Sequence, residues 1–218
     1  MRPPLAALAL LAALVTWKPG AAAADPDLVI GPQAWRILKR DSGPVNYYTQ
    51  VTEPDRTYIH ARYEPGMKTA VLGFQIPEED YQARKVRWSW RAVTLPLGGD
   101  ECASGREDSA AVVYLTWKRG LRYYTLKYVW SSVGPRGKTC DTKRNPFVAQ
   151  DTIILESGAP LGTWLTEEID LPASFRAHFE GGDSKADVPK FVGVGIMSDG
   201  DQTKSESAAD YGSFTVVR

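Results

Sequence analysis

The stretches VRWSWRAVTL (residues 86–95), AAVVYLTW (110–117) and LRYYTLKYVW (121–130) decide the fold of this chain. Each is rich in Val, Tyr, Trp and Thr, and in each the side chains alternate in character at every second residue. That period is typical of a β-strand lying between an apolar core and a second surface. Only Lys118, Arg119 and Gly120 separate the last two stretches, so we expect an antiparallel hairpin that turns at these residues.

Similar short stretches lie on both sides of this region. Further strands are expected at 34–39, 57–63, 69–76, 152–156, 164–170, 191–198 and 211–217. Residues 77–84 predict a loop or a single helical turn, and the best helical candidate is the short piece 173–179. About ten strands separated by Gly- and Pro-containing turns predict an all-β fold, an antiparallel β-sandwich of jelly-roll type with little helix.

The first 24 residues predict an export signal. Arg2 supplies a positive start, residues 5–15 form an apolar run, and the small residues 22–24 precede Asp25. Eleven helical residues rise only about 16 Å, too little for the ~30 Å hydrocarbon core of a bilayer. We therefore expect a signal peptide over 1–24, a single domain over 25–218, no membrane span after cleavage, and a periplasmic or secreted location. An uncleaved anchor is the alternative.

Cys102 and Cys140 are the only cysteines, and each lies in one of two long loops expected at 96–109 and 131–151. Both loops leave the same end of the predicted hairpin, and exported proteins meet an oxidising environment, so we expect a disulfide. The bond closes about 38 residues and stabilises by roughly 3–4 kcal/mol in the chain-entropy model. Two cysteines with only two histidines do not favour a structural zinc site.

The charge balance narrows the classes of partner. Removing residues 1–24 leaves 24 basic against 26 acidic residues. A nucleic-acid-binding surface needs a clear basic excess, so we expect no nucleic-acid partner.

Strand 86–95 carries two different rows of side chains. Trp88 and Trp90 share one face, where they either pack in the core, which we favour, or form a flat platform for a sugar ring. The other face carries Arg87 and Arg91, whose guanidinium groups can fork onto a carboxylate or a pair of sugar hydroxyls. A solvated outer face is the alternative for both arginines.

The predicted hairpin bears aromatic side chains on both faces, more than a two-layer sandwich needs. The surplus either lines a cleft or is covered by the N-terminal segment around Tyr47 and Tyr48. Donor groups on strands are held rigidly, which suits ligand contacts. The candidate ligand-binding residues are Arg87, Arg91, Tyr123 and Lys127.

Asp199, Asp201 and Asp210 are candidate calcium ligands, because carboxylate oxygens in a Gly-containing loop suit a hard cation. Asp and Gly are also common in turns that bind no metal. We assign no catalytic residues and no other cofactor. A Ser-His-Asp arrangement could draw only on His60 and His178, and no Gly-x-Ser-x-Gly turn accompanies them.

Several motifs resemble a bacterial exported family catalogued as domain of unknown function 3047. They are VRWSWRAV (86–93), DSAAVVY (108–114), KYVW (127–130), LGTW (161–164), GIMSDGDQT (195–203) and DYG (210–212). The chain departs from the family pattern at Gln202, where Asn is usual, and at Ser213, where Asp is usual. The resemblance implies no activity.

A looser likeness is to sandwich domains of the galactose-binding type, carried by residues 164–172, Phe175, 192–196 and 211–217. Many such domains bind saccharides without catalysis, although fold alone does not assign function. The sequence thus favours an exported, non-catalytic binding module with a carbohydrate ligand. A glycan-active hydrolase or lyase with carboxylates on a concave sheet remains an alternative. So does a structural envelope protein that binds a protein partner.

Overall fold

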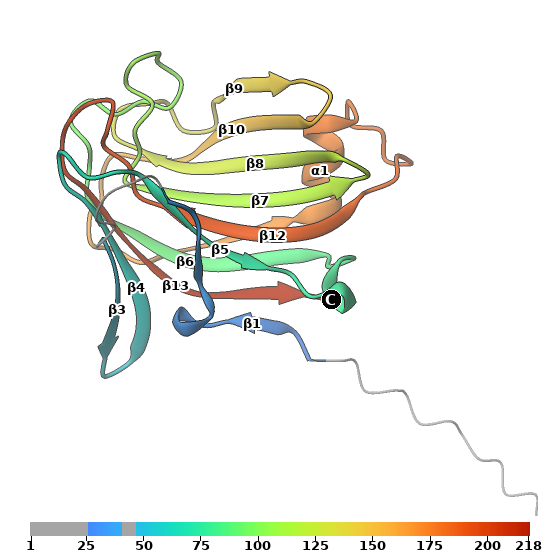
Figure 1. Ribbon diagram of the computed structural model, residues 1–218, viewed down its shortest axis with the longest axis horizontal. Coiled ribbons are helices and arrows are strands. Elements are labelled where there is room, and N and C mark those ends of the chain that lie inside the picture. Colours follow the sequence, from blue (N-terminus) through green and yellow to red (C-terminus); the bar gives the residue numbers. More distant parts are fainter. Residues whose placement is uncertain (1–25, 41–46) are drawn as a thin grey trace, which may run out of the picture.

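The computed structural model describes residues 26–40 and 47–218 and shows two β-sheets stacked face to face (Figure 1). The six-stranded sheet has the order β11-β6-β13-β4-β3, with β1 also paired to β13. Its strands are β1 (Leu28–Ile30), β3 (Tyr48–Glu53), β4 (Arg56–Tyr63), β6 (Lys85–Thr94), β11 (Leu165–Asp170) and β13 (Ser207–Val217). The predicted all-β sandwich is confirmed, whereas the predicted signal segment 1–24 lies outside the described residues.

The seven-stranded sheet has the order β2-β5-β12-β7-β8-β10-β9. Its strands are β2 (Arg36–Arg40), β5 (Ala70–Gln75), β7 (Ala111–Arg119), β8 (Arg122–Ser131), β9 (Thr139–Arg144), β10 (Val148–Ser157) and β12 (Lys190–Met197). The described helices are the short η1 (Pro32–Ala34) and η2 (Glu78–Asp80) and the longer α1 (Leu171–Phe179). None of these helices combines the length and apolar character needed to cross a membrane.

The hairpin of β7 and β8 is antiparallel, as predicted, with pairs running from Ala111–Trp130 to Arg119–Arg122. The turn is tighter than predicted, because Lys118 and Arg119 belong to β7. Only Gly120 and Leu121 connect the strands, and Gly120 has φ +59°. Two-residue hairpin loops need positive φ to match the twist of the strands, and glycine adopts it without a steric penalty.

Three observed strands, β1, β3 and β9, have no counterpart in the sequence prediction. β3 and β9 end their sheets and β1 pairs only with β13, so each has a single neighbour. Edge strands commonly carry polar residues, as β3 and β9 do, which weakens the alternation that marks a strand, whereas β1 is only three residues long. The seven-stranded sheet is also not wholly antiparallel, because β10 runs parallel to β8. The connection through β9 is long enough to return the chain to the same end of the sheet.

The core between the sheets is built from large aromatic side chains. Trp88 and Trp90 are 1% and 0% exposed, so they pack in the core as expected. The Trp88 ring stacks on Phe214 with centroids 5.9 Å apart, and Trp90 meets Trp130 edge to face at 5.8 Å. Their burial places the alternate residues of β6 on the outer face of the six-stranded sheet.

Helix α1, predicted at 173–179, lies at the right-hand end of the two sheets in Figure 1. The Asp170 side chain caps it by accepting a hydrogen bond of 2.8 Å from the Ala173 backbone N–H. Phe175 is fully buried against Trp117 and Tyr124, with ring centroids 5.6 and 5.2 Å away. The helix therefore adds aromatic packing to the core near the β7–β8 turn.

Candidate functional site

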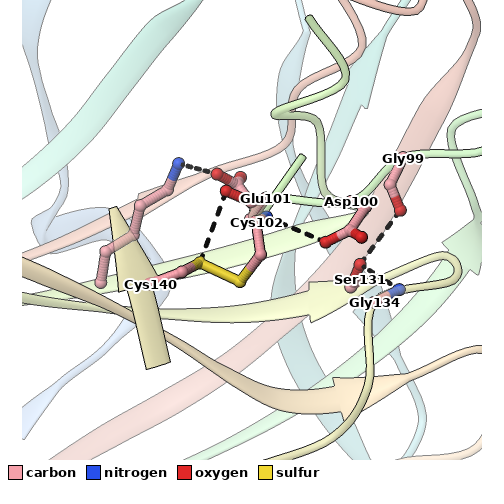
Figure 2. The surroundings of a disulfide bond; sticks show 8 residues. Gly99, Asp100, Glu101, Cys102, Ser131, Gly134 and Cys140 are labelled. Atoms are coloured by element: carbon pink, nitrogen blue, oxygen red, sulfur yellow. Dashed lines mark hydrogen bonds and ion pairs between the residues drawn. A yellow bond between two sulfur atoms is a disulfide. The ribbon is translucent and has the colours of Figure 1, made fainter. Parts of the chain in front are cut away.

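A disulfide joins Cys102 in the loop after β6 to Cys140 in β9, with their Cα atoms 5.5 Å apart (Figure 2). This confirms the pairing expected from the sequence. The Cys102 N–H donates to the Asp100 carboxylate at 2.9 Å, and the Ser131 hydroxyl donates to the Gly99 carbonyl at 3.0 Å. These contacts hold the loop against the seven-stranded sheet.

Lys127, a candidate ligand-binding residue, is 9% exposed and lies beside this loop. Its ammonium group donates to Glu101 Oε2 at 2.7 Å. Burial lowers the pKa of the Lys127 ammonium group, but Tyr114 and Glu101 raise it by more. The pKa therefore lies above its ordinary value. Lys127 is therefore a charged, ion-paired support for the loop.

A small apolar cluster underlies the loop on the outer face of the seven-stranded sheet. Val112, Val129, Ile154 and Met197 are buried there, and Val71, Cys102 and Tyr114 pack against them. The cluster and the disulfide-linked loop cover one end of this face, which we call the closed end. The rest of the face is open.

A groove of about 720 Å³ occupies the open part of this face. That volume lies within the range of about 300–1,000 Å³ typical of small-molecule sites. Its lining residues come from β2, β5, β7, β8, β10 and β12 and from the segment after β5. They are Leu38, Val71, Phe74, Gln75, Tyr81, Tyr114, Thr116, Lys118, Tyr123, Thr125, Gln150, Val192, Gly193, Val194 and Gly195.

The middle of the groove floor is a row of hydroxyl and amide side chains around one glycine. Strand register aligns Gln75, Gly193, Thr116, Thr125 and Gln150 across five neighbouring strands. The hydroxyl oxygens of Thr116 and Thr125 lie 3.3 Å apart. This row offers both donors and acceptors to a polar ligand that lies across the strands.

The next row leads toward the closed end and aligns Gly73, Gly195, Tyr114 and Lys127. A Cβ atom at Gly195 would lie 3.3 Å from the Tyr114 ring, and one at Gly73 would lie 2.0 Å from Leu38. The glycines therefore make room for these side chains. Burial raises the pKa of Tyr114 to about 12, so its hydroxyl stays neutral.

The structure separates the four candidate ligand-binding residues onto two faces. Tyr123 lines the groove and is 42% exposed, whereas Lys127, four residues further along β8, is 9% exposed. Arg87 and Arg91 lie on the outer face of the other sheet, where Arg87 donates to Glu168 at 3.0 Å. The two pairs therefore cannot contact one small ligand.

Arg91 belongs to a polar cluster on that other face. Its guanidinium donates to Asp210 at 2.6 Å, and His60 Nδ1 lies 2.6 Å from the same carboxylate. Arg91 and Arg56 also lie over the Trp164 ring, 4.8 and 4.7 Å from its centre. The partners of Asp210 are thus a histidine and an arginine.

The three aspartates expected to bind calcium are not all together. Asp199 and Asp201 meet Asp108, and one oxygen from each carboxylate lies within 4.8 Å of the others. Asp108, which the sequence reasoning missed, also accepts hydrogen bonds from the backbone N–H groups of Gln202 and Thr203. A cluster of carboxylates suits a hard cation, so the calcium hypothesis remains a prediction for this group without Asp210.

Burial, aided by Asp201 and Asp108, raises the pKa of Asp199 to about 7. The Asp199 carboxylate also accepts hydrogen bonds from Thr69 at 3.2 Å and from the Gly200 N–H at 2.9 Å. No motif spacing could have revealed that Asp108 joins this group, because the residues meet only through folding.

A search among curated proteins gives no match. Among solved structures, the chain is similar to a family 11 carbohydrate-binding module from Clostridium thermocellum (8% identity, 90% of this chain and 97% of that chain covered, TM-score 0.46). It is also similar to the xyloglucanase domain of NopAA from Sinorhizobium fredii (12%, 88% and 97%, 0.43). A third similar structure is endoglucanase 3 of Trichoderma harzianum (12%, 89% and 98%, 0.41).

A family described as "Protein of unknown function (DUF3047)" matches residues 33–215. The match covers both sheets apart from β1 and the last residues of β13, and it includes both cysteines of the disulfide and the aspartate cluster. It confirms the resemblance seen in the sequence motifs. The chain belongs to the DUF3047 family.

Proposed function

We propose that this protein is an exported, non-catalytic binding module that holds a saccharide in the groove of the seven-stranded sheet. The observation that carries the proposal is the composition of that groove. Hydroxyl and amide groups form its middle row, and Tyr81, Tyr114 and Tyr123 are among its other lining residues. Aromatic rings can cover the apolar face of a sugar while Thr and Gln side chains bond its hydroxyl groups.

The groove favours binding over hydrolysis. Among the described residues that line it, none is Asp or Glu. Most glycoside hydrolases place two carboxyl groups on either side of the bond they cleave. Glu101, beside the closed end, is 3% exposed and ion-paired with Lys127, which makes it a support for the loop.

The disulfide supports a periplasmic or secreted location, because such bonds persist in oxidising compartments. The apolar segment at the start of the chain agrees with this proposal.

A glycan-array screen followed by calorimetry tests the proposal. We expect Tyr123→Ala and Gln75→Ala each to weaken binding of the selected glycan about tenfold or more, a loss of about 1.4 kcal/mol. Arg87→Gln is the matched control, since it changes an exposed side chain on the opposite sheet. Loss of binding in Arg87→Gln or Arg91→Gln, with Tyr123→Ala unaffected, would place the site on the other face.

Mass spectrometry of the glycan after incubation with the protein tests the non-catalytic part of the proposal. We expect the glycan to be recovered intact. Shortened products that persist in an independently purified sample would instead establish the alternative, a glycan-active enzyme.

A further inference from the structure

The end of the groove nearest the β7–β8 turn, which we call the open end, is lined by Lys118, and Lys190 lies directly opposite Lys118 on the neighbouring strand. Lys118 in β7 pairs in register with Lys190 in β12. Their neighbours Trp117 and Phe191 are 0% and 1% exposed and point into the core. Because side chains alternate along a strand, both lysines lie on the outer face with the groove.

Each lysine lies against a tyrosine that also lines the groove. The Lys118 ammonium is 5.0 Å from the centre of the Tyr123 ring, and the Lys190 ammonium is 5.3 Å from that of Tyr81. Tyr123 is the register partner of Lys118, and the Tyr81 carbonyl accepts the Phe191 N–H at 2.9 Å. The four side chains therefore form a row across the sheet, Tyr81, Lys190, Lys118 and Tyr123.

This row has an excess of positive charge. Like charges directly opposite each other across two strands are destabilising. Neither Lys118 nor Lys190 forms a salt bridge with any residue that the structure describes. Arg119, the next residue in the chain after Lys118, does form a salt bridge, with Glu180 at 2.9 Å. The described residues that line the groove include no carboxylate either, so a bound anion would relieve the repulsion.

We propose that the groove selects an acidic saccharide, with ring carboxylates received by Lys118 and Lys190. The proposal rests on the proposed function and names its ligand class. The row of Thr and Gln side chains begins about two residues further along the strands, roughly 7 Å away. A carboxylate at the lysines thus leaves the hydroxyl groups of the same or the next ring within reach of that row. The flanking tyrosines supply flat surfaces for the rings.

Matched pairs of ligands test the charge requirement directly. Short oligomers of galacturonic, glucuronic and mannuronic acid are each compared by calorimetry with their methyl esters, which keep the ring geometry and remove the charge. We expect at least one acid to bind tenfold or more tightly than its ester. The advantage should shrink between about 0.01 M and 1 M salt, as the screening length falls from about 30 Å to 3 Å.

A double substitution, Lys118→Gln with Lys190→Gln, tests the two lysines. We expect it to lower the affinity for the acid to that for the ester, so that the preference is lost. Lys118→Arg with Lys190→Arg should retain the preference. Lys68→Gln with Lys204→Gln is the matched control, because it removes the same charge from exposed loops away from the open end. Circular dichroism confirms that all variants are folded.

The outcomes separate this proposal from the broader one. Equal or tighter binding of the ester, with loss of binding in Tyr123→Ala, overturns the acidic ligand and leaves the saccharide groove standing. A control variant that loses the preference as strongly as the Lys118/Lys190 variant overturns the assignment to these lysines. Failure of every acidic and neutral glycan to bind overturns both proposals.

Discussion

Asp199 illustrates at the scale of a single residue how surroundings change an ordinary carboxyl group. It is 8% exposed and shares its site with Asp108 and Asp201. Burial and these two neighbours raise its pKa from 3.8 to about 7. The folded protein therefore holds a proton on Asp199 at pH values where the unfolded chain has released it.

This difference predicts that the Asp199 contribution to stability falls as pH rises from about 4 to 7 in metal-free buffer. Over that range the folded state binds more protons than the unfolded state, so the free energy of unfolding decreases. The loss is on the order of 2–4 kcal/mol, at about 1.4 kcal/mol per pKa unit. Asp199→Asn keeps the Oδ1 acceptor and should flatten this part of the profile. Urea denaturation at several pH values measures the free energy of unfolding of both proteins. Identical slopes of this free energy against pH would contradict the assignment to Asp199.

If the aspartates coordinate calcium, we expect the ion to raise the stability of the folded protein. A cation that binds only the folded state raises its stability by mass action. At pH 8, added calcium should raise the Tm of the wild type but not that of Asp201→Asn. Asp210→Asn is the control, because Asp210 lies with His60 and Arg91 outside the cluster. An equal rise in Tm in all three proteins would show that calcium does not bind at the aspartate cluster.

At the scale of elements, the loop after β6 is attached to the sheet by covalent and ionic links together. The disulfide joins it to β9, and Glu101 joins it to Lys127 in β8. The loop covers the apolar cluster of Val112, Val129, Ile154 and Met197. The closed end of the groove therefore depends on an element that carries few regular backbone pairs of its own.

Replacing Cys102 and Cys140 together by Ser is expected to lower the free energy of unfolding by roughly 2–4 kcal/mol. The 38-residue separation of the cysteines sets this scale through the entropy of the unfolded chain. Hydrogen exchange should accelerate in residues 96–109 more than in β7 and β8. Uniform acceleration through both sheets would show instead that the bond supports the whole sandwich.

At the scale of the whole molecule, Trp88 connects the two sheets. Its ring stacks on Phe214 of its own sheet and lies 6.0 Å from Tyr128 of the other. We expect Trp88→Ala to cost about 3–5 kcal/mol, because the cavity it leaves contacts both layers. Val93→Ala, on the exposed side of the same strand, should cost less than about 1 kcal/mol. Thermal unfolding followed by circular dichroism and fluorescence measures both, and similar losses would contradict the assigned faces of β6.

Much of the local structure was predictable because alternation is a property of consecutive residues. The alternation of Trp88 and Trp90 with the polar residues Arg87, Ser89 and Arg91 indicated which side of β6 enters the core. The β7–β8 hairpin followed from the short connection at Gly120. The disulfide followed from the cysteine count and from the ends of one hairpin. Edge strands such as β9 were missed because their polar residues carry little alternation.

Alternation in the sequence thus determined which residues share a face of a strand, but only the tertiary structure decided which faces meet. Sheet membership depends on pairing between distant segments, which no local period encodes. In the folded protein Arg91 and Tyr123 lie on different sheets. Asp210 lies outside the carboxylate cluster that Asp199 forms with Asp201, whereas Asp108 belongs to it. Pairing between distant segments also set Lys190 opposite Lys118, although 71 residues lie between them in the chain. The groove exists because these long-range pairings align its rows across five strands.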